Sequence, residues 1–244
     1  MKIAVFDTHR FDREALELAN AQFGHALTFF EPRLNRDTAR LAAGFEAVCP
    51  FVNDRLDEAC LTQLASGGVK LVALRSAGFN NVDLQAAERL GIAVVRVPEY
   101  SPYALAEHAF ALLLALDRKI PRAYSRVREM NFSLDGLVGF DLHGKTFGVI
   151  GTGKIGRAAA RIAHGFGCRV LAYDVQQSEE MLRLGVSYVP LDELYRDSDV
   201  ISLHVPLNPQ TRHLIDAAAI ARTKRGVFLV NTGRGALIDT RALI

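Results

Sequence analysis

The sequence predicts an α/β protein built from two successive parallel-sheet units. Two observations support this prediction: short apolar runs alternate with helical patterns twice along the 244 residues, and a segment with two prolines separates the two series. Alternation of this kind is typical of β-α units, whose parallel strands lie under helices on both faces of a sheet. The length suits one large or two small domains, and we expect domains at residues 1–100 and 101–244.

The first series supplies the strands and helices of the N-terminal domain. The apolar, β-branched runs expected as strands are Lys2–Phe6, Ala26–Phe30, Phe45–Phe51, Lys70–Leu74 and Ile92–Val95. Helical periodicity occurs between them, at Asp12–Gln22, Leu56–Ala65 and Val82–Leu90. This order predicts a parallel sheet covered by helices.

A segment with two prolines, Pro98–Pro102, then interrupts the pattern and marks the expected crossing between domains. Ser101 and Pro102 supply the N-cap and first-turn proline of a long helix that we expect to end near Asp117. This helix is apolar on nearly all sides, so we expect it to be buried and assign no catalytic role to its His108. A second helix is expected at about Arg122–Glu129. Such helices can belong to the core of their own chain or contact a second copy, and we expect a homodimer through the helices after residue 100.

The second series begins at Thr146. Its expected strands and helices are Thr146–Ile150, Gly156–Phe166, Arg169–Tyr173, Glu179–Leu184, Val200–Leu203 and Val227–Val230. A last helical pattern starts at Thr240, and neither a cap nor a glycine follows Leu243. We therefore expect the second domain to be incomplete at its C-terminal end.

The strongest motif is a glycine fingerprint, Gly151-Thr152-Gly153-Lys154-Ile155-Gly156, between an expected strand and an expected helix. Gly151 permits a tight turn, Gly153 lets backbone approach a pyrophosphate, and Gly156 lets helix and strand pack closely. An acid, Asp174, ends the next strand about 20 residues later, as the dinucleotide fingerprint requires. Its carboxylate can accept hydrogen bonds from ribose hydroxyls and repels a 2′-phosphate, so the sequence predicts NAD rather than NADP.

A second motif, Asn231-Thr232-Gly233-Arg234-Gly235, directly follows an expected strand of the same series. Ligands of open parallel sheets bind outside the carboxyl ends of the strands, so Arg234 is expected to face the cofactor cleft. Its guanidinium can hold a carboxylate with two parallel hydrogen bonds, which a lysine cannot reproduce.

Composition and charge indicate a soluble protein with a sizeable core. Hydrophobic residues make up 50% of the chain, and 29 basic residues stand against 27 acidic ones. Nucleic-acid-binding proteins concentrate basic residues, so this balance argues against a nucleic-acid partner. No apolar run approaches the roughly 20 residues of a membrane span, so we expect no membrane partner and a cytoplasmic location.

The three cysteines, Cys49, Cys60 and Cys168, are widely spaced in apolar surroundings. They form neither a CxxC motif nor a Cys/His cluster with metal-ligand spacing. We therefore expect buried thiols in a reducing compartment and no metal site.

Several motifs together resemble those of the D-isomer-specific 2-hydroxyacid dehydrogenases. The resemblance spans the whole chain. Its local matches are the glycine fingerprint, Leu74–Asp83, the Pro98–Pro102 segment with Ala106–His108, Leu203–Leu207 and Asn231–Asp239. The segment Asn131–Lys145 is most similar to the D-lactate dehydrogenase branch. The resemblance implies a flavodoxin-like substrate domain followed by a Rossmann NAD-binding domain.

The resemblance also implies a reaction, in which hydride passes between NAD and C2 of a 2-oxo acid, pyruvate above all, giving the D-2-hydroxy acid. Arg234 matches the substrate arginine of the family, and the backbone of Ala77 and Gly78 with the Tyr100 side chain matches its substrate pocket. The remaining matches, at cofactor-contact positions, are Lys154, Ile155, Val205, Pro206, Thr211, Thr232, Gly233 and Arg234.

The chain departs from the family in two places. The general acid of the family, a histidine paired with a glutamate, lies further along the chain than Ile244, so we expect the 244 residues alone to be inactive. Gly233 stands where the family usually has serine, so we expect a looser loop. Two alternatives remain open at this point: a reductase for hydroxypyruvate, glyoxylate or bulkier 2-oxo acids, and a non-catalytic NAD-binding regulatory protein.

Overall fold

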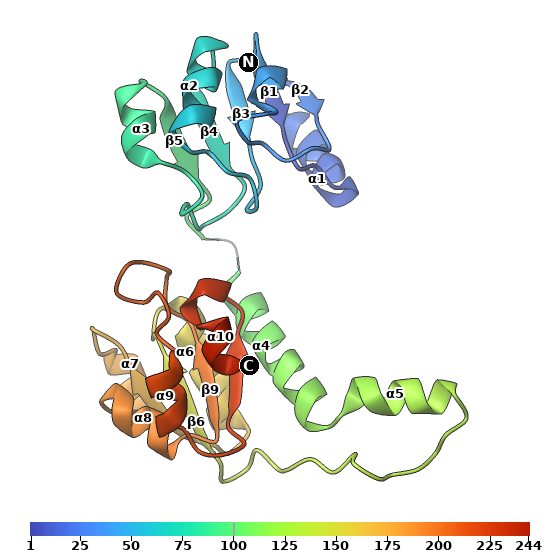
Figure 1. Cartoon of the computed structure of the whole chain (residues 1–244), viewed down its shortest axis with the longest axis vertical. Helices are drawn as coiled ribbons and strands as arrows, with labels where there is room; N and C mark the ends of the chain where they lie inside the picture. The colour runs from blue at the N-terminus through green and yellow to red at the C-terminus, as the bar shows by residue number, and fades with distance from the viewer. Residues whose placement is uncertain (100) are drawn as a thin grey trace. The chain divides into compact units, whose positions relative to one another are not determined.

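A computed structural model describes residues 1–99 and 101–244 of the chain. The backbone divides into two units, Met1–Tyr100 and Ser101–Ile244, referred to below as unit 1 and unit 2. Tyr100, which the sequence suggests for the substrate pocket, lies outside the described residues. Each unit contains one sheet covered by helices (Figure 1).

Unit 1 is a flavodoxin-like α/β unit, as expected. Its sheet has the strand order β2-β1-β3-β4-β5, and every strand pair is parallel. The strands are β1 (Lys2–Val5), β2 (Ala26–Phe29), β3 (Ala47–Cys49), β4 (Leu71–Leu74) and β5 (Ala93–Arg96). The helices are α1 (Arg10–Asn20), α2 (Glu58–Ser66) and α3 (Leu84–Arg89), with the short 3-10 helix η1 (Ala39–Ala42). This strand order is one of the two common arrangements of doubly wound sheets.

Unit 2 contains the second parallel sheet, with the order β10-β9-β6-β7-β8. Its strands are β6 (Thr146–Ile150), β7 (Arg169–Tyr173), β8 (Ser187–Tyr188), β9 (Val200–Leu203) and β10 (Phe228–Asn231). Its helices are α4 (Pro102–Asp117), α5 (Ile120–Arg128), α6 (Lys154–Gly165), α7 (Glu179–Arg183), α8 (Leu191–Asp197), α9 (Ala217–Arg222), η2 (Gly235–Leu237) and α10 (Thr240–Leu243). The first strand, β6, lies in the middle, which is the Rossmann arrangement.

The alternation of side chains along β6 creates a core on each face of this sheet. Phe147 and Val149 pack with α4 and α6, whereas Ile150 packs with α8 and α9 on the other face. All four residues of β9 are buried, as expected for a central parallel strand. The short strand β8 and helix α8 escaped the sequence analysis, because two residues and seven residues carry too little periodicity.

Helix α4 begins as the sequence predicts, with the Ser101 hydroxyl accepting a hydrogen bond from the Ala104 N–H at 3.2 Å. The helix is buried against another element, as expected, but only along one face. Ala106, Phe110 and Leu113 lie in the core against α6, whereas Leu112 and Leu116 are exposed. His108 lies on the exposed side of α4, so the expectation that its side chain is buried with this helix is wrong.

The described cysteines and helices bear on two further expectations. Cys49, Cys60 and Cys168 are buried free thiols, as expected. Among the described residues, no helix has the length and apolar character needed to cross a membrane.

Candidate functional site at the strand ends of unit 2

The expected cofactor residues of unit 2 gather at one edge of its sheet. The fingerprint follows β6, Asp174 follows β7, Val205 and Pro206 follow β9, and the Thr232–Arg234 loop follows β10. Since all these strands are parallel, their carboxyl ends lie on the same edge. Strands β7 and β8 are added on one side of β6, and β9 and β10 on the other, so the strand order reverses between β6 and β9. Ligands of open parallel sheets bind at such switch points.

Two glycines of the fingerprint are required by close contacts. A Cβ atom on Gly156 would lie 1.8 Å from the carbonyl oxygen of Gly151, a distance that no side chain permits. Gly151 itself has φ of +95°, and a Cβ there would lie 2.8 Å from the carbonyl of His204. These contacts join the turn after β6 to the start of α6 and to the end of β9.

The start of α6 has the features that a pyrophosphate group needs. Gly153 is the N-cap and offers no side-chain cap, so the first-turn N–H groups of this twelve-residue helix are not capped by a side chain. A Cβ on Gly153 would meet nothing within 4 Å, so backbone is open to close approach there. Uncapped N–H groups and the positive end of the helix dipole favour an anion, so Gly153, Lys154 and Ile155 fit a dinucleotide pyrophosphate.

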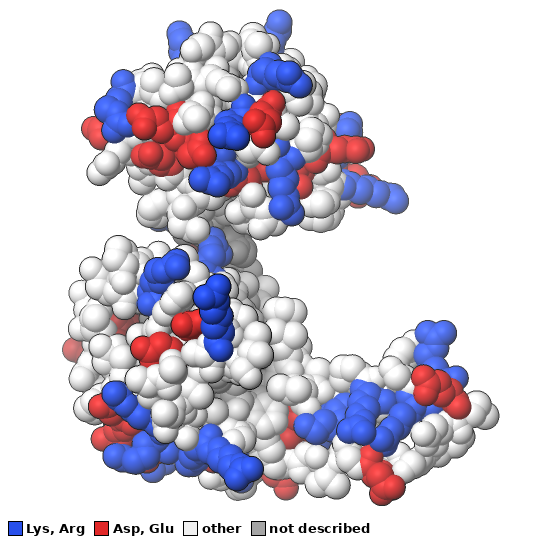
Figure 2. Space-filling view, viewed as in Figure 1, with Lys and Arg blue, Asp and Glu red and all other residues white. Residues whose placement is uncertain are grey.

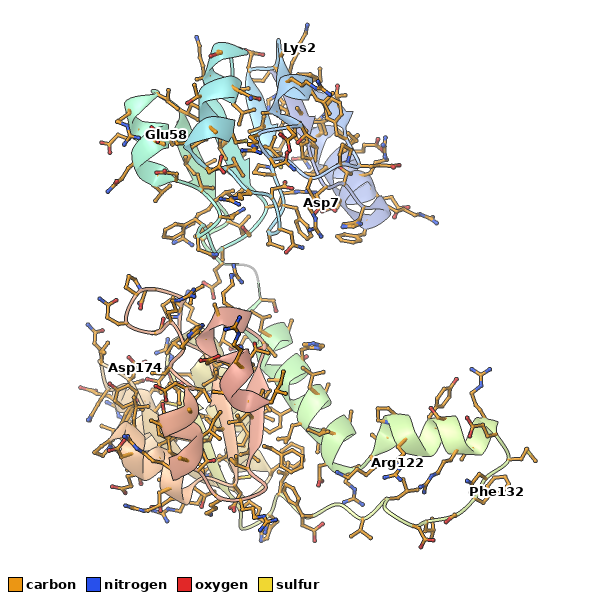
Figure 3. All side chains as sticks on the ribbon, in the orientation of Figure 1. Lys2, Asp7, Glu58, Arg122, Phe132 and Asp174 are labelled. Atoms are coloured by element: carbon orange, nitrogen blue, oxygen red, sulfur yellow. The ribbon has the colours of Figure 1, made fainter. Side chains whose placement is uncertain are left out.

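Asp174 is fixed against the fingerprint turn by hydrogen bonds. Its Oδ2 accepts from the Thr152 N–H at 2.5 Å and from the Thr152 hydroxyl at 3.0 Å. Its Oδ1 accepts from the Gln176 N–H at 3.2 Å. Burial by itself raises the pKa of Asp174, but the donors at Thr152 and Gln176 outweigh it and hold the pKa below its usual value. Asp174 is therefore an ionised acceptor at neutral pH, placed beside the fingerprint turn (Figure 3).

The loop after β9 is held by its own side chains. The Thr211 hydroxyl donates to the carbonyl of Pro206 at 2.6 Å, and Asn208 Oδ1 accepts from the N–H groups of Gln210 and Thr211. Val205 contacts the turn after β6, since a Cβ on Gly151 would lie 2.8 Å from its Cγ1. The structure thus places Val205 next to the fingerprint turn and joins Thr211 to Pro206 in the same loop.

The loop after β10 is shaped by Asn231, to which the sequence analysis assigned no role of its own. Its Nδ2 donates to the carbonyl of Arg234 at 2.9 Å, and its Oδ1 accepts from the Gly233 N–H at 2.9 Å. These two bonds define the turn through Thr232 and Gly233. The loop therefore has internal support even with glycine at position 233. Arg234 then precedes η2 with extended backbone.

In unit 1, Ala77 and Gly78 lie in the loop that follows β4. The carbonyl of Ala77 accepts from Arg96 at 2.9 Å, and the carbonyl of Gly78 accepts from the Ser76 hydroxyl at 2.7 Å. Because a trans peptide points its C=O and N–H in opposite directions, the Gly78 N–H points away from Arg96. This orientation leaves the loop backbone suited to presenting an N–H donor.

Arg75, at the start of the same loop, is a structurally central residue that the sequence analysis did not identify. Its guanidinium pairs with the buried Asp12 at 2.8 Å and lies 4.8 Å from the Phe51 ring centroid. The loop at Phe51 is also held by Asp54, whose Oδ2 accepts from the Phe51 N–H at 2.7 Å. Burial raises the pKa of Asp54 to about 6. Sequence reasoning could not find this network, since Asp12 and Arg75 are far apart along the chain.

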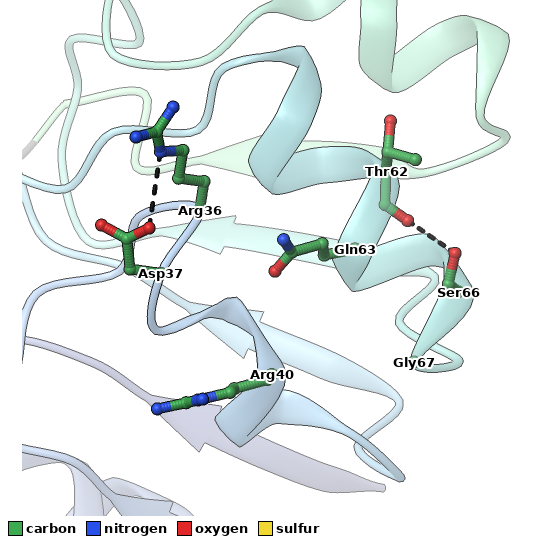
Figure 4. A pocket seen from close by; sticks show the side chains of 7 residues that line it. All are labelled: Arg36, Asp37, Arg40, Thr62, Gln63, Ser66 and Gly67. Carbon is green, nitrogen blue, oxygen red and sulfur yellow. Dashed lines mark hydrogen bonds and ion pairs between the residues drawn. The ribbon is translucent and has the colours of Figure 1, made fainter.

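Unit 1 also has a surface pocket, between η1 and the end of α2 (Figure 4). Its polar groups largely pair with one another: Arg36 with Asp37 at 3.4 Å, and the Ser66 hydroxyl with the Thr62 carbonyl at 2.9 Å. The chain enters β4 just after Gly67, so this pocket lies at the amino edge of the sheet, opposite the loop of Ala77 and Gly78. It is therefore separate from the candidate site.

The strand order, the glycine turn and the acid at the end of β7 define unit 2 as a Rossmann dinucleotide-binding fold. A family model described as D-isomer specific 2-hydroxyacid dehydrogenase, NAD binding domain, matches residues 110–244. The D-lactate dehydrogenase of Escherichia coli (strain K12) is 54% identical over 244 residues, which are 100% of this chain and 74% of that protein. The chain therefore belongs to the D-isomer specific 2-hydroxyacid dehydrogenases, a family whose cofactor is NAD.

Solved structures agree with this assignment. The apo-structure of D-lactate dehydrogenase from Escherichia coli has a TM-score of 0.93 and 54% identity, and the match covers 100% of this chain and 77% of that one. D-lactate dehydrogenase from Aquifex aeolicus, complexed with NAD and lactic acid, has a TM-score of 0.87 and 37% identity over 99% of this chain and 72% of that one.

His204 follows β9, with its backbone next to the fingerprint turn, and its surroundings determine its charge. The imidazole Nε2 lies 2.9 Å from the buried hydroxyl of Ser202, within hydrogen-bond distance. Burial lowers the pKa of His204 to about 4, so the ring is neutral at neutral pH. A neutral imidazole held in this way supports the end of β9, and it lacks the second, acidic ring proton that a general acid releases.

We expect His204 to titrate near pH 4 and to make unit 2 less stable as the pH falls. The unfolded state takes up a proton below about pH 6.5 and the folded state only near pH 4, so the free energy of unfolding should fall between these values by up to about 1.4 kcal/mol per pH unit. Denaturant titrations across this window should give a flatter dependence for His204→Gln. The matched control is His164→Gln, which removes an exposed imidazole of α6. An NMR titration midpoint above pH 6 for His204 would contradict the lowered pKa.

Proposed function

We propose that the protein reduces a 2-oxo acid, pyruvate above all, to the D-2-hydroxy acid with NADH as hydride donor. The observation that carries this proposal is the convergence of the glycine turn, Asp174 and the Arg234 loop at the strand ends of unit 2. The family membership gives the reaction class, and the similarity to D-lactate dehydrogenases favours pyruvate.

The chain's own residues divide the work of holding the cofactor. The uncapped start of α6 binds the pyrophosphate, with Gly151, Thr152 and Gly156 shaping the turn beneath it. Asp174 accepts hydrogen bonds from the adenosine ribose and repels a 2′-phosphate. The other proposed contacts lie on the loops around this turn: Lys154, Ile155, Val205, Pro206, Thr211, Thr232 and Gly233. The bound nicotinamide supplies the hydride.

Substrate-binding roles are proposed for Arg234 of unit 2 and for residues of unit 1, as the family resemblance implies. Arg234 holds the carboxylate and carbonyl of the 2-oxo acid with its planar, forked guanidinium. The backbone of Ala77 and Gly78 binds the carboxylate, and Tyr100 lines the pocket. We accordingly propose residues 1–100 as the substrate domain and residues 101–244 as the NAD-binding domain.

Reduction of a 2-oxo acid also requires a group that donates a proton to the developing alkoxide. We propose that residues 1–244 lack this proton donor. His204 is neutral and half-buried, and His108 and His164 are exposed on α4 and α6. The family's catalytic histidine and glutamate lie beyond the positions matched here. We therefore propose that residues 1–244 by themselves bind NAD but turn over slowly.

The three cysteines support a reducing, cytoplasmic location. Burial raises the pKa of Cys49 to about 11 and that of Cys60 to about 12, and it also raises the pKa of Cys168. Thiols in this state are poorly nucleophilic and serve as small apolar core residues.

A homodimer through the helices after residue 100 is proposed from the arm of unit 2, defined as α5 with residues 129–138. No residue of α5 is buried, and the helix extends away from the sheet of unit 2 (Figure 1). Arg126 donates to the carbonyls of Ser133 and Asp135, and Arg122 donates to that of Gly136, so basic side chains hold the returning segment (Figures 2 and 3). The exposed apolar side chains of the arm are Ile120, Tyr124, Val127, Met130, Phe132, Leu134 and Val138.

An arm of this kind needs a partner surface. A nine-residue helix without tertiary packing is marginal in water. Contiguous exposed apolar side chains mark interaction surfaces, and the arm continues into the exposed apolar side of α4 at Leu112 and Leu116. A second copy offers the same two apolar surfaces, which a two-fold axis can pair with each other.

We expect NAD to bind more tightly than NADP, with Asp174 as the cause. The carboxylate accepts bonds from two ribose hydroxyls and faces a 2′-phosphate with like charge. Titrating both reduced cofactors by fluorescence should show the preference, and Asp174→Ala should reduce it by at least tenfold, a free-energy change of about 1.4 kcal/mol. Equal affinities in the unmodified protein, or an unchanged ratio in Asp174→Ala, would remove Asp174 from this role.

We expect Arg234→Lys to weaken a substrate analogue while sparing the cofactor. Loss of a bidentate carboxylate contact should reduce oxamate binding to the NADH complex by about tenfold or more, because hydrogen bonds to charged groups are worth about 1.5–3 kcal/mol. NADH affinity should change by less than about threefold on the same scale. Arg241→Lys, at an exposed arginine of α10, is the matched control. Unchanged oxamate affinity in Arg234→Lys would contradict the proposal.

We expect purified residues 1–244 to oxidise NADH with pyruvate far more slowly than a full-length homologous enzyme. General acid catalysis contributes typically about 10²–10⁴-fold, and the proposal places that group outside these residues. Steady-state absorbance of NADH at saturating pyruvate measures the rate. A rate within about tenfold of the full-length enzyme would show that this chain supplies the proton, and His108→Gln and His204→Gln would then identify the donor.

We expect the protein to sediment as a dimer that Val127→Glu and Phe132→Glu convert to monomer. Burying an unpaired carboxylate in an apolar contact costs several kcal/mol, enough to dissociate a dimer. Leu18→Glu places the same charge on an exposed leucine of α1 and should leave the dimer intact. A protein that sediments as a monomer, or arm variants that remain dimeric, would refute the proposed interface.

A further inference from the structure

We propose that Tyr188 is a positioning residue for binding of the adenosine ribose. The Tyr188 hydroxyl holds Thr152, and Thr152 in turn holds the Asp174 carboxylate. The inference rests on the proposed role of Asp174 and extends it to a residue on a different strand. Tyr188 ends the two-residue strand β8, which the sequence analysis did not predict.

The contacts form one continuous chain at the strand ends. The Tyr188 hydroxyl donates to Thr152 Oγ1 at 2.8 Å, and the Thr152 hydroxyl donates to Asp174 Oδ2 at 3.0 Å. On its other side the Tyr188 hydroxyl accepts from the Ser178 N–H at 2.9 Å. One phenol oxygen therefore bridges the fingerprint turn after β6 and the segment that leads from β7 into α7.

The charge of Asp174 sets the direction of every proton in this chain. An ionised carboxylate only accepts hydrogen bonds, so the Thr152 proton must point to Asp174 Oδ2. The oxygen of Thr152 is then an acceptor for Tyr188, and the phenol oxygen is in turn an acceptor for the Ser178 N–H. Hydrogen bonds aligned in this way polarise one another, so the Tyr188 donor strengthens the bond from Thr152 to the carboxylate.

The Tyr188 ring is anchored well enough to hold its hydroxyl in place. Tyr188 pairs with Ala172 of β7 and packs against the core cluster on the face covered by α4 and α6. Thr152 is also buried, so neither hydroxyl exchanges its partner for water without a cost. By contrast, Asp174 is only half-buried and the neighbouring Val175 is 90% exposed, so the carboxylate lies near solvent.

The consequence is that Asp174 keeps one orientation toward the ribose. Without the phenol hydroxyl, Thr152 Oγ1 loses its donor and the Ser178 N–H loses its acceptor. The Asp174 carboxylate and the segment after it can then rotate or shift, which weakens bonds to both ribose hydroxyls and relieves the repulsion of a 2′-phosphate. The discrimination between NAD and NADP should fall, while binding at the uncapped start of α6 is shared by both cofactors and should persist.

The first test compares NADH and NADPH affinities of purified residues 1–244 by fluorescence titration. Tyr188→Phe should reduce the ratio of the NADPH dissociation constant to the NADH dissociation constant by about threefold to tenfold, which is the effect of one indirect hydrogen bond. Tyr195→Phe is the matched control, because its hydroxyl donates to the Leu214 carbonyl in the core on the opposite face. A general loss of stability would weaken both cofactors alike and leave the ratio unchanged.

The double variant Asp174→Ala/Tyr188→Phe should show the same ratio as Asp174→Ala, because Tyr188 acts through that carboxylate. If Tyr188→Phe does not fold, Thr152→Val breaks the same chain at its middle and should give the same reduction. A ratio within twofold of the unmodified protein in these variants, or an equal reduction in Tyr195→Phe, would overturn the inference.

A second readout separates this inference from the role of Asp174 itself. In the cofactor-free protein, carbon-13 NMR of the Asp174 carboxyl should show a higher pKa in Tyr188→Phe than in the unmodified protein, and no change in Tyr195→Phe. If Asp174→Ala leaves the cofactor ratio unchanged while this pKa rises, the proposed role of Asp174 fails and the coupling to Tyr188 stands. An unchanged pKa of Asp174 in Tyr188→Phe would overturn the coupling.

Discussion

The contact between Gly156 and the carbonyl of Gly151 is the constraint on which the candidate site depends. A Cβ on Gly156 would lie 1.8 Å from that oxygen, so helix α6 can start directly above the end of β6 only with hydrogen at this position. The close start places the uncapped N–H groups of α6 at the sheet edge. It also places the turn against the carbonyl of His204, so that the ends of β6 and β9 form one surface.

The two units stabilise the carboxyl edges of their sheets in different ways. In unit 1 a partly buried guanidinium, that of Arg75, pairs with the buried Asp12 and lies over the Phe51 ring. In unit 2 a backbone N–H, that of Thr152, binds the Asp174 carboxylate directly. The second solution holds the Asp174 carboxylate through backbone and hydroxyl donors and leaves it partly exposed. Such a group can still recognise a polar ligand, whereas the buried ion pair of unit 1 serves to hold loops together.

In the arm of unit 2 the polar groups are bonded internally and the apolar side chains are exposed, which is the reverse of the sheet regions. Its internal bonds run from Arg122 and Arg126 to backbone carbonyls, and its large apolar side chains face outward. In the sheet regions the apolar side chains are buried and the polar groups lie at the strand ends. An element that satisfies its polar groups internally and exposes its apolar ones is suited to burial against another protein surface.

The sequence by itself determined the two sheets and the place of the dinucleotide turn, because these depend on neighbours along the chain. Strand periodicity gave β6, β7 and β9 with the bounds that the structure has, and the strand-turn-helix order located Gly151, Gly156 and Asp174. Only the tertiary structure decided the exposure of His108, the ion pair of Arg75 with Asp12, and the hydrogen-bond chain from Tyr188 to Asp174. The physical reason is that those contacts join residues from separate strands and helices, and their geometry exists only once the sheet order is set.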